Sequence, residues 1–170
     1  MRLGLMQTFD QSKSLEEELP PLGLGYISSY IKKFAKFDDI VFEKTPEELA
    51  AHKPTLIGIS AVTQYYTMAV EQARQMKRDT GAAMVVGGGH ITCLPDSLDP
   101  IFDVGVIGEG EDTFLELFEL HRAGKWGPEY FKEVRGICYH DENGKVRRTP
   151  TRPPIRPMDK VPPPDRELLG

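Results

Sequence analysis

Short apolar segments alternate with helix-forming segments along the first 122 residues, and this alternation is the feature that most restricts the fold. The apolar segments are nearly continuous, as in residues 56–61 (LIGISA), which is typical of strands covered on both faces. Alternating strands and helices form a parallel sheet. We therefore predict an α/β fold with a doubly wound, parallel, five-stranded sheet. The expected strands are 2–6, 38–43, 56–61, 82–86 and 104–107, and the expected helices are 20–34, 45–52, 68–78, 111–122 and a helical turn at 95–98.

The pattern changes after the last of these helices. Two extended segments, 136–140 and 145–149, flank an Asn-Gly pair, which is typical of a β-hairpin. Residues 150–164 then hold 7 of the 14 prolines, and such a segment buries too little apolar surface to fold alone. We therefore expect an α/β domain at 1–133, a C-terminal β-hairpin extension at 134–149 and a Pro-rich linker at 150–170.

Composition restricts the functional class. The net charge of −5 argues against a nucleic-acid partner, and no apolar run reaches the length of a membrane span. The two cysteines, Cys93 and Cys138, are too few for a disulfide framework, and the N-terminus lacks the pattern of a secretory signal. We expect a protein of the reducing cytoplasm, with no membrane partner.

The candidate site lies in the loops that follow the strands, because open parallel sheets bind ligands beyond the carboxyl ends of their strands. These loops are rich in small residues and hydroxyls, which let a large polar ligand approach the backbone. No catalytic side chain and no metal-ligating cluster is predicted. The candidate ligand-binding residues are Thr8, Phe9, Ser60, Ala61, Val62, Thr63, Gly87, Gly88, Gly89, His90, Thr92, Gly108, Glu109 and Gly110.

The triple glycine at 87–89 is the most informative of these loops, since it leaves a gap without side chains. It is neither a P-loop nor the spaced dinucleotide fingerprint, and a tight turn is the alternative explanation. His90 is expected to form hydrogen bonds rather than to ligate a metal. Glu109 is expected to contact the ligand, whereas Glu111 is assigned to the helix N-terminus, where the macrodipole favours acidic residues.

Four segments with this order and spacing resemble one family, the N-terminal cobalamin-binding domain of cobalamin-dependent radical S-adenosylmethionine enzymes. The segments are 20–26 (PPLGLGY), 58–63 (GISAVT), 85–92 (VVGGGHIT) and 108–111 (GEGE). The tail segment 156–166 (RPMDKVPPPDR) resembles the connection to the radical domain. The resemblance extends from about Leu3 to Leu169 and implies a Rossmann-like, flavodoxin-type domain.

The resemblance also implies where the cofactor lies. The nucleotide tail of cobalamin would enter between the loops at Ser60 and at Gly87–Gly88, with the corrin ring over the first loop and the Glu109 loop. Asp10 is followed by Gln11 and Ser12, so the histidine that ligates cobalt in classical members is missing. The Cys-x-x-x-Cys-x-x-Cys motif of the radical domain is also missing. S-adenosylmethionine and a 4Fe–4S cluster are therefore expected only in a following domain, which would commonly make the parent protein a methyltransferase.

A flavin- or nucleotide-binding domain of flavodoxin type is the alternative function. The first loop, residues 7–19, is long, acidic and free of glycine, which argues against a flavodoxin phosphate loop. Whether this chain alone is an enzyme stays open at this point.

Overall fold

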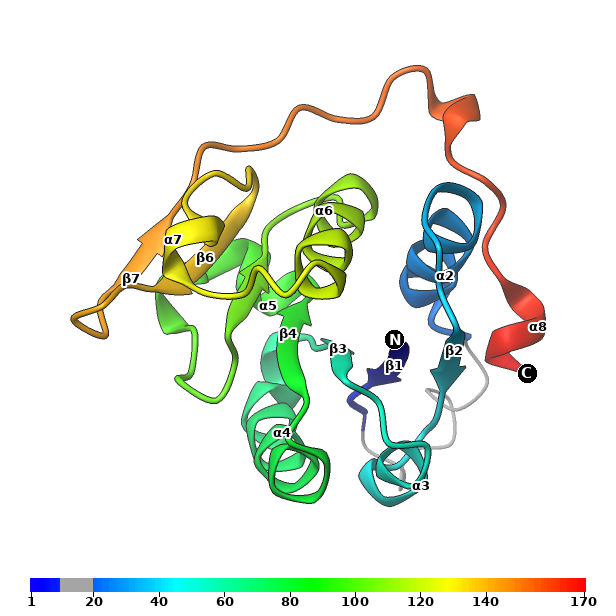
Figure 1. Cartoon of the computed structure of the whole chain (residues 1–170), viewed down its shortest axis with the longest axis horizontal. Coiled ribbons are helices and arrows are strands. Elements are labelled where there is room, and N and C mark those ends of the chain that lie inside the picture. The colour runs from blue at the N-terminus through cyan, green and yellow to red at the C-terminus, as the bar shows by residue number, and fades with distance from the viewer. Residues whose placement is uncertain (10–19) are drawn as a thin grey trace.

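A seven-stranded sheet lies between two layers of helices in the computed structural model, which describes residues 1–9 and 20–170 (Figure 1). The strand order is β2-β1-β3-β4-β5-β6-β7, with the first five strands parallel and the last two antiparallel. The strands are β1 (Arg2–Gln7), β2 (Asp39–Phe42), β3 (Leu56–Ser60), β4 (Ala83–Gly87), β5 (Val104–Val106), β6 (Ile137–His140) and β7 (Val146–Arg148).

The five predicted parallel strands are confirmed, but the sheet has seven strands rather than five. The predicted hairpin is β6 and β7, and it continues the sheet instead of forming a separate extension. β6 pairs antiparallel with β5, with Gly105 opposite Cys138. A Cβ at Gly105 would lie 2.6 Å from the Cys138 sulfur, so the glycine makes room for this pairing. The hairpin sequence alone does not predict that β6 pairs with β5.

The helices divide between the two faces of the sheet (Figure 1). α2 and α6 pack on one face with Ile27, Ile31 and Phe118 in the core. α3, α4 and α5 contribute Leu49, Ala73 and Ile91 to the core on the other face. The helices are α2 (Leu22–Phe34), α3 (Pro46–Ala51), α4 (Tyr66–Thr80), α5 (Gly89–Cys93), α6 (Glu111–Arg122), α7 (Pro128–Phe131) and α8 (Arg166–Leu169), with 3-10 turns η1 (Thr63–Tyr65), η2 (Pro95–Ser97) and η3 (Met158–Lys160).

Two helix ends carry local signals that the sequence contains. The backbone N–H of Glu48 donates to the Thr45 hydroxyl over 3.3 Å, which caps α3. α4 ends at Gly81, where a φ of +70° suits glycine. The short helices α5, α7 and α8 were not predicted, because four or five residues carry too little periodicity to show a helix.

The strand order reverses beside β1, and this reversal positions the site. The chain leaves β1 through α2 on one face to reach β2, and it returns through α3 on the other face to reach β3. The connections therefore diverge beyond the carboxyl ends of β1 and β3. Such a switch point opens a crevice in which open α/β sheets bind ligands.

The tail, residues 150–170, which the sequence predicts to be a linker, lies on the domain. It runs from β7 across the face that carries α6 and α2 and ends in α8 beside β2 (Figure 1). Ile155 and Leu169 are 8% and 6% exposed, respectively. These apolar anchors belong to the core of the domain, so the tail needs no core of its own. We call residues 150–170 the strap.

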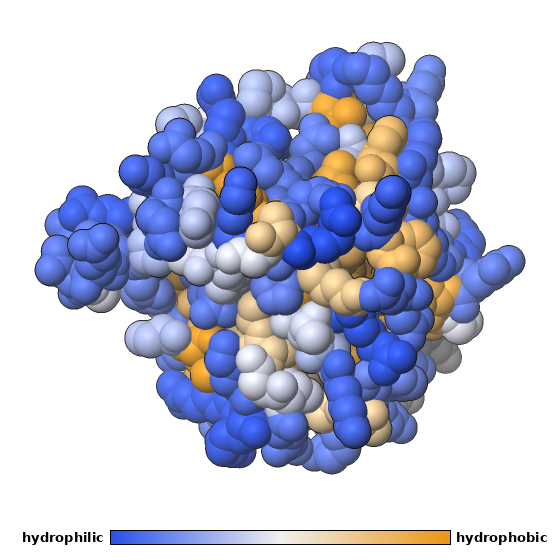
Figure 2. Space-filling view, viewed as in Figure 1, coloured by the Kyte–Doolittle hydropathy of each residue, from blue (hydrophilic) through white to orange (hydrophobic). Residues whose placement is uncertain are grey.

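The surface seen in the same orientation is mainly hydrophilic, with apolar side chains confined to small patches (Figure 2). Within residues 1–9 and 20–170, every helix is too short or too polar to cross a bilayer. Neither does this part of the chain bring three metal-ligating side chains together.

Candidate functional site

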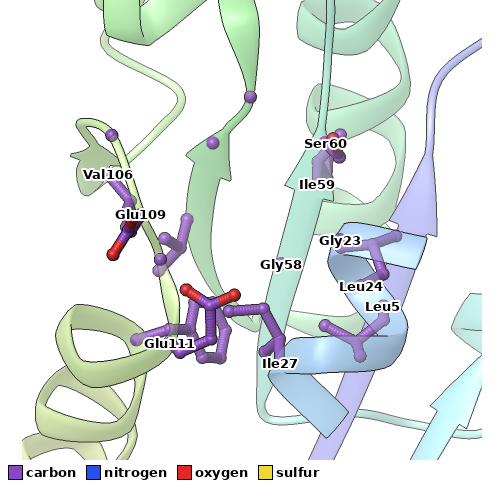
Figure 3. Close-up of a pocket in the computed structure, with 16 residues that line it drawn as sticks. Leu5, Gly23, Leu24, Ile27, Gly58, Ile59, Ser60, Val106, Glu109 and Glu111 are labelled. Carbon is purple, nitrogen blue, oxygen red and sulfur yellow. The ribbon is translucent and has the colours of Figure 1, made fainter. Parts of the chain in front are cut away.

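A cavity of about 240 Å³ opens at the carboxyl ends of β3 and β4, between α2 and α6 (Figure 3). We call it the glycine cavity, because six glycines line it. In Figure 3, Val106 and Glu109 lie on one side, Gly23 and Leu24 on the other, with Gly58 and Ser60 between them. The lining residues are Leu5, Gly23, Leu24, Ile27, Gly58, Ile59, Ser60, Val85, Gly87, Gly88, Val106, Gly108, Glu109, Gly110, Glu111 and Phe114.

The walls of the glycine cavity are apolar, and among the described residues that line it two acids are the only ionisable groups. Leu5, Val106 and Phe114 supply apolar surface from the sheet and from α6. Glu109 and Glu111 bring carboxylates to the same space. The cavity therefore suits an apolar or flat group whose polar edge carries hydrogen-bond donors. Glu111, which was assigned to the helix alone, both begins α6 and lines the cavity.

The three consecutive glycines have three different roles. Gly87 ends β4 and lines the cavity, and the nearest atom to a Cβ there would be Val106 Cβ at 3.9 Å. Gly88 has a φ of +97°, and a Cβ there would lie 2.7 Å from the Ala61 carbonyl oxygen. Gly89 begins α5. Both explanations offered for the motif therefore apply, since one glycine leaves space for a ligand and the next makes a tight turn.

A second cavity, of about 460 Å³, lies beyond the carboxyl ends of β1 and β3. We call it the edge cavity. Thr8 holds its rim in place through two hydrogen bonds. The Thr8 hydroxyl donates to Gln72 Oε1 over 2.8 Å, and the Thr8 N–H donates to the Ser60 carbonyl over 3.0 Å. Ser60 lines both cavities, so the two spaces lie on either side of the end of β3. The lining residues are Gln7, Thr8, Phe9, Ser60, Val62, Gln64 and Tyr65.

Nine of the fourteen predicted site residues line these two cavities, and five do not. Ser60, Gly87, Gly88, Gly108, Glu109 and Gly110 line the glycine cavity; Thr8, Phe9, Val62 and again Ser60 line the edge cavity. The remaining five are absent from both linings, and of these Ala61 and His90 are buried whereas Thr63, Gly89 and Thr92 are exposed. They are Ala61, Thr63, Gly89, His90 and Thr92.

His90 supports the loops from behind. Only 6% of it is exposed, its ring stacks on Tyr66 at 3.7 Å between centroids, and Nε2 lies 2.8 Å from the Ser97 hydroxyl. The expected hydrogen-bonding role is present, but toward the protein. The unpredicted helix α5 turns His90 toward the α4 face. Thr92 has a similar role, because its hydroxyl accepts the Gly108 N–H over 3.1 Å and holds the Gly108 loop.

Residues 12–118 match the family model described as "B12 binding domain". The match includes β3, β4, β5 and every lining residue of the glycine cavity except Leu5. The chain belongs to the B12-binding domain family. This membership favours cobalamin over the flavin or nucleotide alternative.

Two curated relatives match this chain over part of their own, longer chains. An uncharacterised methyltransferase of Pyrococcus horikoshii is 33% identical over 161 residues, covering 88% of this chain and 34% of the relative. The anaerobic magnesium-protoporphyrin IX monomethyl ester cyclase of Rubrivivax gelatinosus is 30% identical, covering 85% of this chain and 28% of the relative. The chain thus spans about a third of the length of these relatives.

Solved structures share the fold of this B12-binding domain. The cobalamin-dependent S-adenosylmethionine radical enzyme OxsB with aqua-cobalamin bound superposes with a TM-score of 0.75 at 21% identity, covering 99% of this chain and 24% of that one. The radical S-adenosylmethionine methyltransferase TsrM from Kitasatospora setae, with cobalamin and an iron–sulfur cluster bound, gives a TM-score of 0.71 at 18% identity, covering 95% of this chain and 31% of that one.

The residues of this B12-binding domain fit a cofactor with a flat, largely apolar end. At Gly23 and Gly108 an added Cβ would meet no atom within 4 Å, so bare backbone faces open space on two sides of the glycine cavity. The segment Asp10–Gln11–Ser12, which stands where classical members carry a cobalt-ligating histidine, lies outside the described residues.

The α2 and α6 walls of the cavity were missed by sequence reasoning. Gly23 and Phe114 lie in segments that were correctly predicted as helices, but their apolar periodicity indicated only packing in the core. Gly23 and Gly25 interrupt the start of a helix, where glycine is unfavourable, and this was the one signal that could have marked the wall. The lining residues that are not among the fourteen candidates are Leu5, Gly23, Leu24, Ile27, Gly58, Ile59, Val85, Val106, Glu111 and Phe114 for the glycine cavity, and Gln7, Gln64 and Tyr65 for the edge cavity.

Stability is expected to decrease when the pH is lowered from 7.5 to 5.5, because burial holds the pKa of His90 and of His121 below the ordinary value. The unfolded chain, with histidine pKa values of about 6.5, then binds protons that the folded state excludes, at a cost of roughly 1 kcal/mol. Urea unfolding at both pH values measures this difference. His90→Gln should show a smaller decrease, and an unchanged decrease would contradict the role of His90.

Carboxylates do not account for this window. Hydrogen bonds with Arg148 and Lys145 hold the pKa values of Asp96 and Asp141, respectively, below the usual value of 3.8. A carboxylate with a lowered pKa stabilises the fold above its unfolded pKa, and that contribution is lost only as the pH falls through the folded pKa. The contribution of these two carboxylates to stability is therefore lost only below about pH 4.

Proposed function

We propose that this chain holds cobalamin at the glycine cavity and the edge cavity, as the cofactor-binding part of a larger radical S-adenosylmethionine enzyme. The glycine cavity, at the carboxyl ends of β3 and β4 next to the switch point, is the observation that carries this proposal. An apolar space bordered by bare backbone suits the nucleotide tail of the cofactor, which brings a flat heterocycle. The corrin ring, which is far larger than either cavity, is assigned to the surface that joins them.

Individual residues have distinct roles in this proposal. Ser60, Gly87 and Gly88 border the entrance through which the tail passes. Glu109 and Glu111 accept hydrogen bonds from amide or hydroxyl groups of the ligand. Thr8 and Phe9 contact the ligand from the first loop. His90 and Thr92 position the loops and do not touch the ligand.

The catalytic chemistry is assigned to another part of the parent protein. The curated relatives are about three times as long as this chain, and one is named a methyltransferase, which favours methyl transfer as the chemistry that bound cobalamin supplies. S-adenosylmethionine and the iron–sulfur cluster would be held by the following domain. Residues 1–149 are assigned to the cofactor domain, with 134–149 as part of its sheet, and 150–170 to the connection.

The compartment is inferred from the cysteines. Cys93 is exposed and Cys138 is buried, and both are free thiols. Free thiols, one of them exposed, suit the reducing cytoplasm.

Titration with hydroxocobalamin tests the proposed function. The chain is expected to give saturable binding with a dissociation constant at or below about 10 μM, corresponding to roughly 7 kcal/mol, seen both in the visible spectrum and as calorimetric heat. Flavin mononucleotide serves as the control ligand. Saturable flavin binding without cobalamin binding would favour the flavin alternative. The absence of binding of both ligands would refute the proposed function.

A further inference from the structure

The strap is fastened to α2 mainly at the Asp165 carboxylate, and Lys33 Nζ on α2 also donates to the Lys160 carbonyl over 3.1 Å. Asp165 Oδ2 accepts hydrogen bonds from the Ser28 hydroxyl over 2.7 Å and from Lys32 Nζ over 2.5 Å. The Asp165 N–H donates to the Gly25 carbonyl over 3.0 Å. The Asp165 side chain is only 10% exposed and Ser28 is fully buried. This is a closed set of hydrogen bonds rather than a loose surface ion pair.

A glycine on α2 lets the strap come close at this place. A Cβ at Gly25 would lie 3.0 Å from Leu169 Cδ1 and 3.2 Å from Pro164 Cβ. α8 therefore packs directly on the backbone of α2. Sequence reasoning found this glycine only as part of a family motif and gave it no structural role.

The other end of the strap is fastened to α6 and to the loop before it. The Ile155 N–H donates to Glu109 Oε2 over 3.2 Å, and Glu109 is itself a lining residue of the glycine cavity. Arg152 forms an ion pair with Glu116 on α6. The strap is thus attached on both sides of the space between α2 and α6.

Those two helices are opposite walls of the glycine cavity. Gly23 and Ile27 belong to α2, and Glu111 and Phe114 belong to α6. One direct polar contact between the walls is the hydrogen bond from the Tyr30 hydroxyl to Asp112 over 2.5 Å. The strap adds a second connection between the walls, because its Asp165 is bonded to α2 and its Ile155 to the Glu109 loop. Loss of this connection leaves the spacing of the walls less restricted.

We infer that Asp165 is a positioning residue for the glycine cavity, and that docking of the strap and binding of the cofactor stabilise each other. The inference rests on the proposed function. Linkage requires the coupling to be reciprocal. Strap docking strengthens cofactor binding, and bound cofactor holds the strap against α2 by the same factor.

The first test compares cobalamin affinity in variants. Asp165→Ala is expected to raise the dissociation constant for hydroxocobalamin about fivefold or more, the usual lower limit of allosteric coupling. Asp165→Asn keeps an acceptor for Ser28, so its dissociation constant should rise less. Arg74→Ala is the control, because it removes an exposed ion pair with Asp99 on the opposite face. Urea midpoints show that each variant is folded. An Asp165→Ala variant with a lower midpoint but an unchanged dissociation constant would have a purely structural defect, and that result would overturn the inference.

The second test measures the reciprocal effect by trypsin cleavage of the wild-type chain. Arg152 and Arg156 each precede a proline and resist trypsin, so Lys160 and Arg166 are the cleavable positions in the strap. Saturating hydroxocobalamin is expected to slow cleavage after Lys160 about fivefold or more. Equal rates with and without cofactor would overturn the inference while the proposed function stands. If the wild-type chain fails to bind cobalamin, both fall together.

Discussion

The Gly87→Leu variant is expected to keep its fold but to bind cobalamin with a dissociation constant at least about 100-fold higher, equivalent to about 2.7 kcal/mol. Val85 and Gly87 are two positions apart on β4, so both point toward the α2–α6 layer. A side chain at position 87 therefore enters the glycine cavity, whose volume is only about 240 Å³. Cobalamin titration measures the loss. Urea unfolding should show a stability change within about 1 kcal/mol, since the nearest atom to the new Cβ is 3.9 Å away.

A smaller side chain at the same position provides the matched control. Gly87→Ala adds one methyl group to the cavity wall, so we expect its dissociation constant to stay within about threefold of wild type. The two variants share one backbone position and differ only in the volume they place in the cavity. Wild-type affinity in a folded Gly87→Leu variant would show that the ligand does not use this cavity.

The Gly88→Ala variant is expected to be destabilised by about 2–4 kcal/mol, from an unfavourable backbone conformation together with an overlap. Gly88 has a φ of +97°, and the new Cβ would lie 2.7 Å from the Ala61 carbonyl oxygen. That oxygen accepts the His90 N–H over 3.3 Å, and the Ala61 N–H donates to the Gly87 carbonyl over 3.1 Å. These hydrogen bonds hold the Ala61 backbone in place. Any movement that removes the overlap therefore has to disturb the loop after β3 and the loop after β4.

Urea unfolding of Gly88→Ala beside Gly89→Ala tests this prediction. At Gly89 an added Cβ meets no atom within 4 Å, and the residue lies in α5. Alanine favours a helix over glycine, so Gly89→Ala should be neutral or slightly stabilising, by up to about 1 kcal/mol. Similar losses of stability in both variants would mean that the loop tolerates no substitution, and the specific strain at Gly88 would be refuted.

Local sequence patterns predicted the parallel part of the fold. Continuous apolar segments such as 56–60 indicated strands buried on both faces, and the Thr45 cap marked the start of α3. The position of the site also followed from the pattern, because parallel strands present their carboxyl ends at one edge. Ser60, Gly88 and Glu109 were placed near one another on that ground, and all three line the glycine cavity.

The orientation of individual loop residues could not be predicted in the same way. His90 and Gly88 are two positions apart in one loop, yet Gly88 lines the cavity and His90 stacks on Tyr66 behind it. A five-residue helix makes this difference, and a segment of that length has no periodicity that the sequence could reveal.

The sequence by itself determined the strands, the longer helices and the edge of the sheet at which the loops gather. These properties depend on apolar periodicity, caps and turns, which act between residues close in the chain. Only the tertiary structure decided that the hairpin joins β5, that α2 and α6 wall the cavity, and that Asp165 fastens the strap to Ser28. Such contacts join residues up to 137 positions apart. They form where complementary surfaces meet in the packed molecule, and local patterns do not specify which buried surface meets which.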